Sequence, residues 1–404
     1  MPASVDRTAR AAKTAHVVIV GGGVMGAAAA CFLARDHALG VTVLERDPSY
    51  AQASSALSAS SIRQQFSQPV NIALSQASFG FLRGIASEIA VAGEALPDVG
   101  LVERGYLMLA GLPGADVLRT NHAVQRAHGA DVALLDAAAL RERMPWIAVD
   151  GIALAALGLS GEGWFDGYGV LHAFRRKAIA CGARFVKADA ARLLGAADRI
   201  DGVLAADGTR FDADAVLVAA GAWSAPLLAR VGVAIPVRAR KRDVFVVDAP
   251  VALPGCPLVV DTSGVWFRPE GDAGRFIVGA PPRGEDRDDV PLDAIDHGLF
   301  DDVIWPALAA RVPAFEALRV RSAWAGYYEM NTFDHNGLVG PLPGWRNLHV
   351  ACGFSGHGLQ QAPAVGRAIA AWIADGAWPP GLDLTPLAPG RVDAGRPLVE
   401  RNVI

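Results

Sequence analysis

The pattern of apolar and polar positions is most informative between residues 16 and 46, which read HVVIVGGGVMGAAAACFLARDHALGVTVLER. Residues 16–20 are a short apolar run rich in β-branched side chains, which predicts a buried parallel strand. The apolar face of residues 27–33 predicts a helix that ends at Gly40, and residues 41–44 predict a second strand. Together these elements predict a βαβ unit.

Three glycines at G-x-G-x-x-G spacing, Gly21, Gly23 and Gly26, lie between the first strand and the helix. The first permits a tight turn, the second lets a pyrophosphate approach the backbone, and the third lets helix and strand pack closely. Val24 and Met25 belong to the same turn, where free N–H groups at the helix start would meet the phosphates. In this context the glycines predict an adenine dinucleotide site, whereas a glycine-rich turn without a ligand is the alternative.

An acidic residue, Glu45, ends the second predicted strand 19 positions after Gly26. Its carboxylate can accept hydrogen bonds from a ribose diol and would repel a 2′-phosphate, so NADP is disfavoured. Arg46 is expected to flank the same ribose. The next loop offers three serines as hydrogen-bond donors to the pyrophosphate: Ser54, Ser55 and Ser58. These residues alone leave NAD and FAD open.

Two later stretches repeat a buried strand followed by a glycine turn and a helix. Strand-like runs at 184–191, 200–204 and 212–218 lead into AAGAWSA. The last run, 347–351, precedes CGFSGHGLQQAPAVGRAIAAWIADG, in which Pro363 is expected to fit only in the first helical turn.

The 404 residues suit two domains, and the predicted fold class is α/β with an α+β two-domain organisation. A Rossmann-like dinucleotide-binding domain would be interrupted twice by a β-rich substrate domain with helices. Strand-like runs at 105–108, 243–247, 265–268 and 276–278 support the second domain. The expected segments are 14–88, 162–234 and 331–404 for the nucleotide domain, and 89–161 and 235–330 for the substrate domain.

Composition narrows the classes of function. The net charge is −4 with interspersed signs and no basic tract, so nucleic acid is not expected as a partner. No signal peptide or 18-residue apolar run is evident, so no transmembrane segment is expected, although peripheral membrane contact stays open. Four cysteines without ligand spacing predict a reducing compartment and no metal site: Cys31, Cys181, Cys256 and Cys352.

Three separated motifs, GGGVMG with Glu45, AAGAWSA at 219–225 and GFSGHGLQQAP at 353–363, resemble the D-amino-acid oxidase, glycine oxidase and sarcosine oxidase superfamily of FAD enzymes. Within it, the stretches at 161–171 and 311–340 are similar to mitochondrial FAD-dependent oxidoreductase-domain proteins linked to respiratory complex I assembly. The resemblance implies FAD rather than NAD. It also implies oxidation of the carbon–nitrogen bond of an amino acid or secondary amine by hydride transfer to flavin N5. Because the N-terminus lacks a convincing mitochondrial leader, a bacterial cytoplasm is expected.

The resemblance extends the expected cofactor site to later segments. Backbone donors of the loop at 353–358 would face the flavin oxygen at which negative charge gathers on reduction. His357 would either touch the flavin edge or make a structural hydrogen bond. The later residues expected at the cofactor are Ala190, Ala220, Gly221, Trp223, Gly353, Phe354, Ser355, Gly356, His357, Gly358 and Leu359.

Two arginines compete as partner of a substrate carboxylate. The resemblance places Arg63, in SASSIRQQF, and Arg242, in RKRDVFV, where relatives hold that group, and an ion pair unrelated to substrate is the alternative for each. Tyr328 stands where amine dehydrogenases of the superfamily can have an arginine. An aromatic wall that excludes water, or else ordinary core packing, is expected of Trp266, Trp324, Tyr327 and Tyr328.

Two absences bear on the chemistry. Sarcosine oxidases place a lysine near the strand at 276–279, but the lysines of this chain are Lys13, Lys177, Lys187 and Lys241. Electrons are therefore expected to pass to a quinone or other carrier rather than rapidly to oxygen. Residues 325–327 also lack the cysteine that attaches FAD in those enzymes, so non-covalent FAD is expected. The alternative function is a flavin-containing assembly or interaction factor for a respiratory complex with little turnover.

Overall fold

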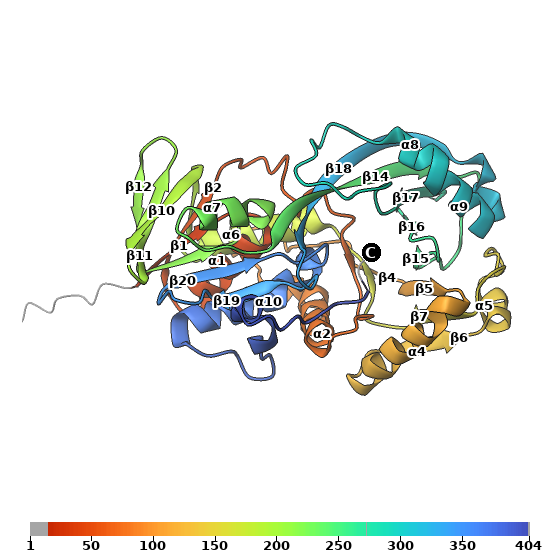
Figure 1. Cartoon of the computed structure of the whole chain (residues 1–404), viewed down its shortest axis with the longest axis horizontal. Helices are drawn as coiled ribbons and strands as arrows, with labels where there is room; N and C mark the ends of the chain where they lie inside the picture. Colours follow the sequence, from red (N-terminus) through yellow and green to blue (C-terminus); the bar gives the residue numbers. More distant parts are fainter. Residues whose placement is uncertain (1–14, 272, 403–404) are drawn as a thin grey trace, which may run out of the picture.

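The computed structural model describes residues 15–271 and 273–402, and its two halves lie side by side along the long axis (Figure 1). One half is built on a six-stranded sheet that is parallel except for its edge strand β19, which pairs antiparallel with β20. The strands are, in spatial order, β19 (Leu338–Pro341), β20 (Leu348–Cys352), β13 (Ala215–Val218), β1 (His16–Val20), β2 (Gly40–Glu45) and β9 (Arg184–Lys187).

Both faces of this sheet are covered, which explains why its strands are apolar throughout. Val17 and Ile19 of β1 pack toward the helices, whereas Val18 and Val20 pack toward an antiparallel meander. The helices are α1 (Val24–Asp36), α2 (Pro69–Arg83), α6 (Gly167–Ala180) and α10 (Gly358–Asp375). The meander consists of β10 (Ala190–Ala196), β11 (Arg199–Ala205) and β12 (Arg210–Asp212).

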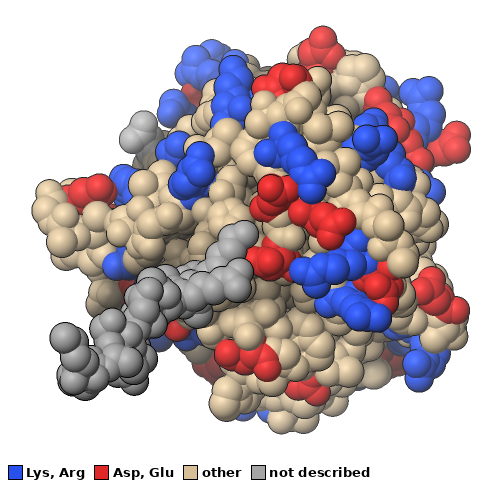
Figure 2. Space-filling model, turned by 90° about the vertical axis from the view of Figure 1, so that its left-hand side faces the viewer, with Lys and Arg blue, Asp and Glu red and all other residues tan. Residues whose placement is uncertain are grey.

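The meander end of the molecule carries basic and acidic side chains close to one another (Figure 2). Arg210 lies 2.7 Å from Asp212, and Arg346 lies 2.6 Å from Asp198. These pairs are largely exposed, so each contributes little to stability.

The other half is built on an eight-stranded, mostly antiparallel sheet. Its strands are, in spatial order, β18 (Arg319–Asn331), β14 (Val237–Asp248), β17 (Arg275–Gly279), β16 (Trp266–Pro269), β15 (Leu258–Val260), β5 (Tyr106–Ala110), β7 (Leu154–Gly158) and β6 (Val132–Leu135). The long strands β14 and β18 reach from this sheet to the parallel half (Figure 1). Helical elements of this half are α4 (Leu112–Ala127), α5 (Ala137–Arg143), α8 (His297–Leu299), η2 (Phe300–Ile304), α9 (Trp305–Arg311) and η3 (Pro313–Ala317).

Shorter elements complete the chain. A small sheet consists of β3 (Ser61–Ile62), β8 (Gly163–Trp164) and β4 (Val102–Glu103). The remaining helical turns are α3 (Ile85–Glu88), η1 (Gly221–Trp223), α7 (Ser224–Ala229), η4 (Thr385–Leu387) and α11 (Gly390–Asp393).

The predicted mixed α/β fold is confirmed, and two local predictions are wrong. Helix α1 ends at Asp36 rather than at Gly40, because Ala38 takes the left-handed conformation (φ 51°) and the Leu39 N–H bonds back to the Leu33 carbonyl. Pro363 lies inside α10 rather than in its first turn. The helix thus forgoes one backbone hydrogen bond. The expected domain boundaries stay predictions.

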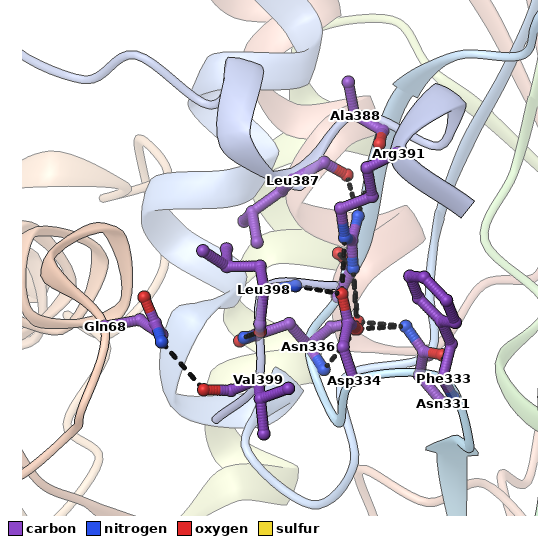
Figure 3. Close-up of polar contacts among 12 residues, drawn as sticks. Gln68, Asn331, Phe333, Asp334, Asn336, Leu387, Ala388, Arg391, Leu398 and Val399 are labelled. Atoms are coloured by element: carbon purple, nitrogen blue, oxygen red, sulfur yellow. Dashed lines mark hydrogen bonds and ion pairs between the residues drawn. The ribbon is translucent and has the colours of Figure 1, made fainter. Parts of the chain in front are cut away.

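A buried ion pair fixes the C-terminal segment to the loop after β18 (Figure 3). The guanidinium of Arg391 donates to both carboxylate oxygens of Asp334, at 2.7 and 3.0 Å. The Leu398 N–H also donates to Asp334, and the Gln68 side chain donates to the Val399 carbonyl at 2.7 Å. Asn402 then contacts α4 through Asn121. The last described residues therefore join the two halves.

Helices α1 and α10 cross at small residues. A Cβ atom added at Gly366 would lie 2.6 Å from the Cβ of Ala28 and 2.9 Å from its carbonyl carbon. The facing stretch of α1 is a run of fully buried alanines. The crossing therefore leaves no room for one more methyl group.

We predict that Gly366→Ala lowers the free energy of unfolding by about 1–3 kcal/mol, because overpacking displaces α1. The matched control is Gly80→Ala in α2, where a Cβ would meet nothing within 4 Å. That substitution should raise the free energy of unfolding by about 0.5–1 kcal/mol. Denaturant unfolding measures both, and equal effects of the two substitutions would contradict the prediction.

Candidate functional site

A cavity lies at the carboxyl ends of β1, β2 and β13 and extends to β14 and β18. It encloses about 1890 Å³ not filled by protein atoms, part of it open to solvent. Its walls include most residues that the sequence assigns to a cofactor. These are Gly21, Gly23, Val24, Met25, Glu45, Arg46, Ser54, Ser55, Ser58, Ala190, Ala220, Gly221, Trp223, Gly356, Gly358 and Leu359.

In the glycine turn after β1, the backbone of Gly21 and Gly23 lines the cavity. Gly21 has φ +101°, and a Cβ there would lie 2.4 Å from the Ala219 carbonyl oxygen. A Cβ at Gly26 would lie 1.9 Å from the Gly21 oxygen, so this third glycine serves packing and lies outside the lining. No side chain caps the start of α1 at Gly23. The first turn of the helix thus offers N–H groups and a positive dipole end to an anion.

Glu45 is held rigidly at the end of β2. One carboxylate oxygen accepts the Gly22 N–H and the other accepts the Asp47 N–H, both at 2.8 Å. Beside it, the Arg46 guanidinium lies 3.7 Å from the centre of the Trp223 ring, a cation–π contact between segments distant in sequence. The acid and the stacked pair therefore form one wall of the cavity, where a ribose diol can be bound by the remaining carboxylate lone pairs.

The second glycine loop approaches the cavity from the opposite end of the chain. Gly356 has φ +93°, and a Cβ there would lie 2.4 Å from the Tyr328 ring. Gly358 begins α10 without a side-chain cap. The backbone of Gly356 and Gly358 therefore lines the cavity, and Gly356 packs against the Tyr328 ring.

Several expected cofactor contacts lie behind this wall rather than in it: Gly353, Phe354, Ser355 and His357. The Ser355 hydroxyl accepts the Asn331 N–H at 3.0 Å, which anchors the loop to β18. The His357 ring packs edge-on against Phe66, and burial together with the nearby Arg63 charge lowers its pKa to about 3. A neutral, buried imidazole favours the structural alternative, and contact of His357 with the flavin edge stays a prediction.

The two competing arginines have different surroundings. Arg63 is buried outside the cavity lining, where its guanidinium donates to the backbone carbonyls of Gln65 and Asn402. Arg242 lines the cavity from β14 and makes a bidentate ion pair with Asp286 at 2.9 and 2.8 Å. Arg63 is thus held by backbone carbonyls rather than by an ion pair, whereas the ion pair expected as the alternative is found at Arg242, which also lines the cavity.

The aromatic wall is only partly at the cavity. Tyr328 lines it, with the Arg242 guanidinium 5.1 Å from the ring centre. Trp266 and Tyr327 also line it, and the Tyr327 hydroxyl donates to the Val290 carbonyl at 2.9 Å. Trp324 lies outside the lining and donates to the Leu57 carbonyl, so this member of the expected wall is structural.

Sequence reasoning missed Glu329, whose side chain lines the cavity between η1 and the second glycine loop. The backbone N–H groups of Gly353 and Phe354 donate to it, yet burial raises the pKa of its carboxyl to about 7. The signal in the sequence is weak, because one acid within YYEMN does not reveal the orientation of its side chain.

A family model described as DAO, FAD dependent oxidoreductase, matches residues 16–372. The chain belongs to this family. FAD-dependent oxidoreductase domain-containing protein 1 of Xenopus laevis is 43% identical over 425 residues, which cover 96% of this chain and 85% of the relative.

Solved structures agree with this family assignment. Glycine oxidase from Geobacillus kaustophilus superimposes with a TM-score of 0.77 at 28% identity, covering 93% of this chain and 99% of that one. L-proline dehydrogenase from P. horikoshii has a TM-score of 0.83 at 24% identity, covering 95% and 99%, and shows a shared fold. The cofactor is therefore FAD rather than NAD.

The residues present fit this cofactor. Glycines of two loops bring backbone to one cavity, and the Glu45 carboxylate is held at the end of the second strand of the first βαβ unit, where a ribose can be bound. Within residues 15–271 and 273–402, no helix is long and apolar enough to cross a membrane. The FAD-dependent oxidoreductase domain-containing proteins matched here come from animals, so the placement in a bacterial cytoplasm is unsupported and stays a prediction.

We predict that FAD affinity falls as the pH rises through about 7, because a raised pKa keeps Glu329 neutral below that pH and ionisation adds a charge to a cavity that takes a diphosphate. In Glu329→Gln the side chain stays uncharged, so this pH dependence should be lost. Fluorescence titration of the apoprotein with FAD between about pH 6 and pH 8 measures the dissociation constant. The same pH slope in both proteins would show that another group is responsible.

Proposed function

We propose that the protein is an FAD-dependent dehydrogenase that oxidises the carbon–nitrogen bond of a small amino acid or secondary amine. The observation that carries the proposal is an aromatic end of the cavity that contains one arginine fork, Arg242, beside Tyr328 and Trp266. When bound, the flavin supplies a hydride acceptor. The protein's own residues then have two tasks, which are to hold the substrate and to exclude water.

Arg242 is the proposed partner of the substrate carboxylate. A guanidinium matches a carboxylate with two parallel hydrogen bonds, and its partly buried position strengthens the interaction. The Arg242 side chain is 16% exposed and lines the cavity, whereas Arg63 is committed to backbone carbonyls behind the wall. Arg63 would then stabilise the junction of the two halves rather than contact the substrate.

The aromatic side chains are proposed to prepare the amine. Tyr328 is fixed against Gly356, and Tyr327 is fixed through its hydroxyl, so both rings are rigid. A site of low polarity disfavours the charged form of an amine and lowers its pKa. The neutral amine is the form that can lose a hydride from its α-carbon, so no protein base is required.

Electron transfer to a quinone or another carrier, rather than rapidly to oxygen, is part of the proposal. Among the described residues that line the cavity there is no lysine, and Lys241 is bound to Asp243 and to the Ala294 carbonyl. Non-covalent FAD is also proposed, since the four cysteines lie outside the lining. The lack of a lysine among the described lining residues supports a dehydrogenase over an oxidase.

We expect one or more amino acids or secondary amines to bleach the bound flavin under anaerobic conditions. In Arg242→Met the apparent dissociation constant for a carboxylate-bearing substrate should rise by about 10²-fold, because a charged hydrogen-bonded pair is lost. The control is Arg63→Met, in which the apparent substrate dissociation constant should change little although stability falls. An absence of bleaching across a broad amine panel, with co-purification of respiratory-complex subunits, would instead support the assembly-factor alternative.

We also expect the reduced protein to reoxidise slowly in air and rapidly with a soluble quinone. No lysine of the described cavity lining is available to stabilise superoxide near the cofactor. Stopped-flow absorbance after anaerobic reduction measures both rates. Reoxidation in air as fast as that of true oxidases would refute the proposed electron acceptor.

A further inference from the structure

An acidic segment, residues 281–296, runs along the first half of β14. Strand β17 pairs with β14 only from Val244 onward, so the preceding backbone edge is free of β17. The segment occupies that edge, where Arg240 and Asp288 form an isolated antiparallel bridge and the Asp289 N–H donates to the Ala239 carbonyl at 2.9 Å. The segment is therefore held in register with the strand that carries Arg242.

The acids of this segment pair with the arginines of β14. Asp288 lies 2.8 Å from Arg240 and 3.5 Å from Arg238. Asp286 pairs with Arg242 through both terminal nitrogens of the guanidinium. Arg242 belongs to the cavity lining, whereas the two arginines paired with Asp288 do not. Asp286 and Asp288 thus both pair with arginines of β14, but only the arginine paired with Asp286 lines the cavity.

A guanidinium can bind a carboxylate through its two Nη atoms or through Nε and one Nη, and Asp286 occupies the Nη1/Nη2 edge of Arg242. A third contact from the same Nη1 atom goes to the Lys241 carbonyl at 2.9 Å. Among the described residues that line the cavity, the other cation is Arg46, which is stacked on Trp223. A small carboxylate that enters the aromatic end therefore meets a fork that already holds an anion.

We propose that Asp286 is a specificity-determining residue that occupies the Nη1/Nη2 edge of Arg242 in place of a substrate carboxylate, which must displace it to bind at that edge. The inference rests on the proposed function, since it assigns Arg242 to the substrate. Breaking the pair between Asp286 and Arg242 offsets part of the free energy that a ligand carboxylate gains at Arg242, so Asp286 weakens the binding of monocarboxylates. It does not weaken the binding of amines without a carboxylate, which have no need of Arg242.

The segment can release Asp286 without detaching from the strand. Asp288 stays paired with Arg240, and the Val290 carbonyl stays bound to the Tyr327 hydroxyl. The Asp286 side chain is 33% exposed, so after displacement its carboxylate can be solvated by water. Displacement then requires a local rearrangement near Asp286 rather than movement of the whole segment.

The test is a titration of the FAD-loaded protein with acetate, a monocarboxylate without an amine, read from the flavin absorbance spectrum. In Asp286→Asn the dissociation constant for acetate should fall by about tenfold relative to the unsubstituted protein. The matched control is Asp288→Asn, which removes the same charge from the same segment and should leave the constant unchanged. In the background of Arg242→Met, Asp286→Asn should have no effect.

An unchanged or higher dissociation constant in Asp286→Asn, or an equal fall in Asp288→Asn, would overturn the inference. With an amino acid that reduces the flavin, the same variant should lower KM while kcat is retained, an effect that a purely structural role does not produce. Acetate binding needs no turnover. If no amine bleaches the flavin but the acetate constants follow the predicted order, the proposed oxidation fails while the role of Asp286 stands.

Discussion

The close contact between helix α1 and the turn before it is the constraint on which the cavity depends. With a hydrogen atom as its side chain, Gly26 lets the helix start rest on the Gly21 carbonyl. This contact fixes where the N–H groups of the first helical turn point, and it sets the turn beside Glu45, whose carboxylate accepts the Gly22 N–H. The contact between Gly26 and Gly21 therefore positions both the helix start, which can bind an anion, and Glu45, which can bind a ribose.

The same principle recurs at the far side of the cavity. There Gly356 rests on the Tyr328 ring, which in turn lies beside Arg242 on the neighbouring strand. The second glycine loop and the paired strands β14 and β18 are thus one packed unit. The contact between them tolerates no added methyl group at Gly356.

Sequence patterns predicted the parts of the site that are local. The glycine turn, the acid at the end of β2 and the bounds of β1 follow from spacing and periodicity over a few tens of residues. The environments of Arg63 and His357 did not, because burial behind the wall is set by partners such as Asn402 and Phe66 that lie far away in the chain. Asp286 was hidden for the same reason, since its segment has no regular periodicity. The errors at Gly40 and Pro363 arose because tertiary packing overrode the usual helix-end signals.

The order of the strands has a consequence for biosynthesis. Strand β13 lies between β1, which precedes it in the chain, and β20, which follows it, and the loop after β20 supplies Gly356 and Gly358. During synthesis, the loop that contains Gly356 and Gly358 therefore follows the whole segment that includes β14 and β18. A nascent chain therefore leaves the apolar surface of α1 and α2 that α10 covers exposed until α10 itself has been synthesised.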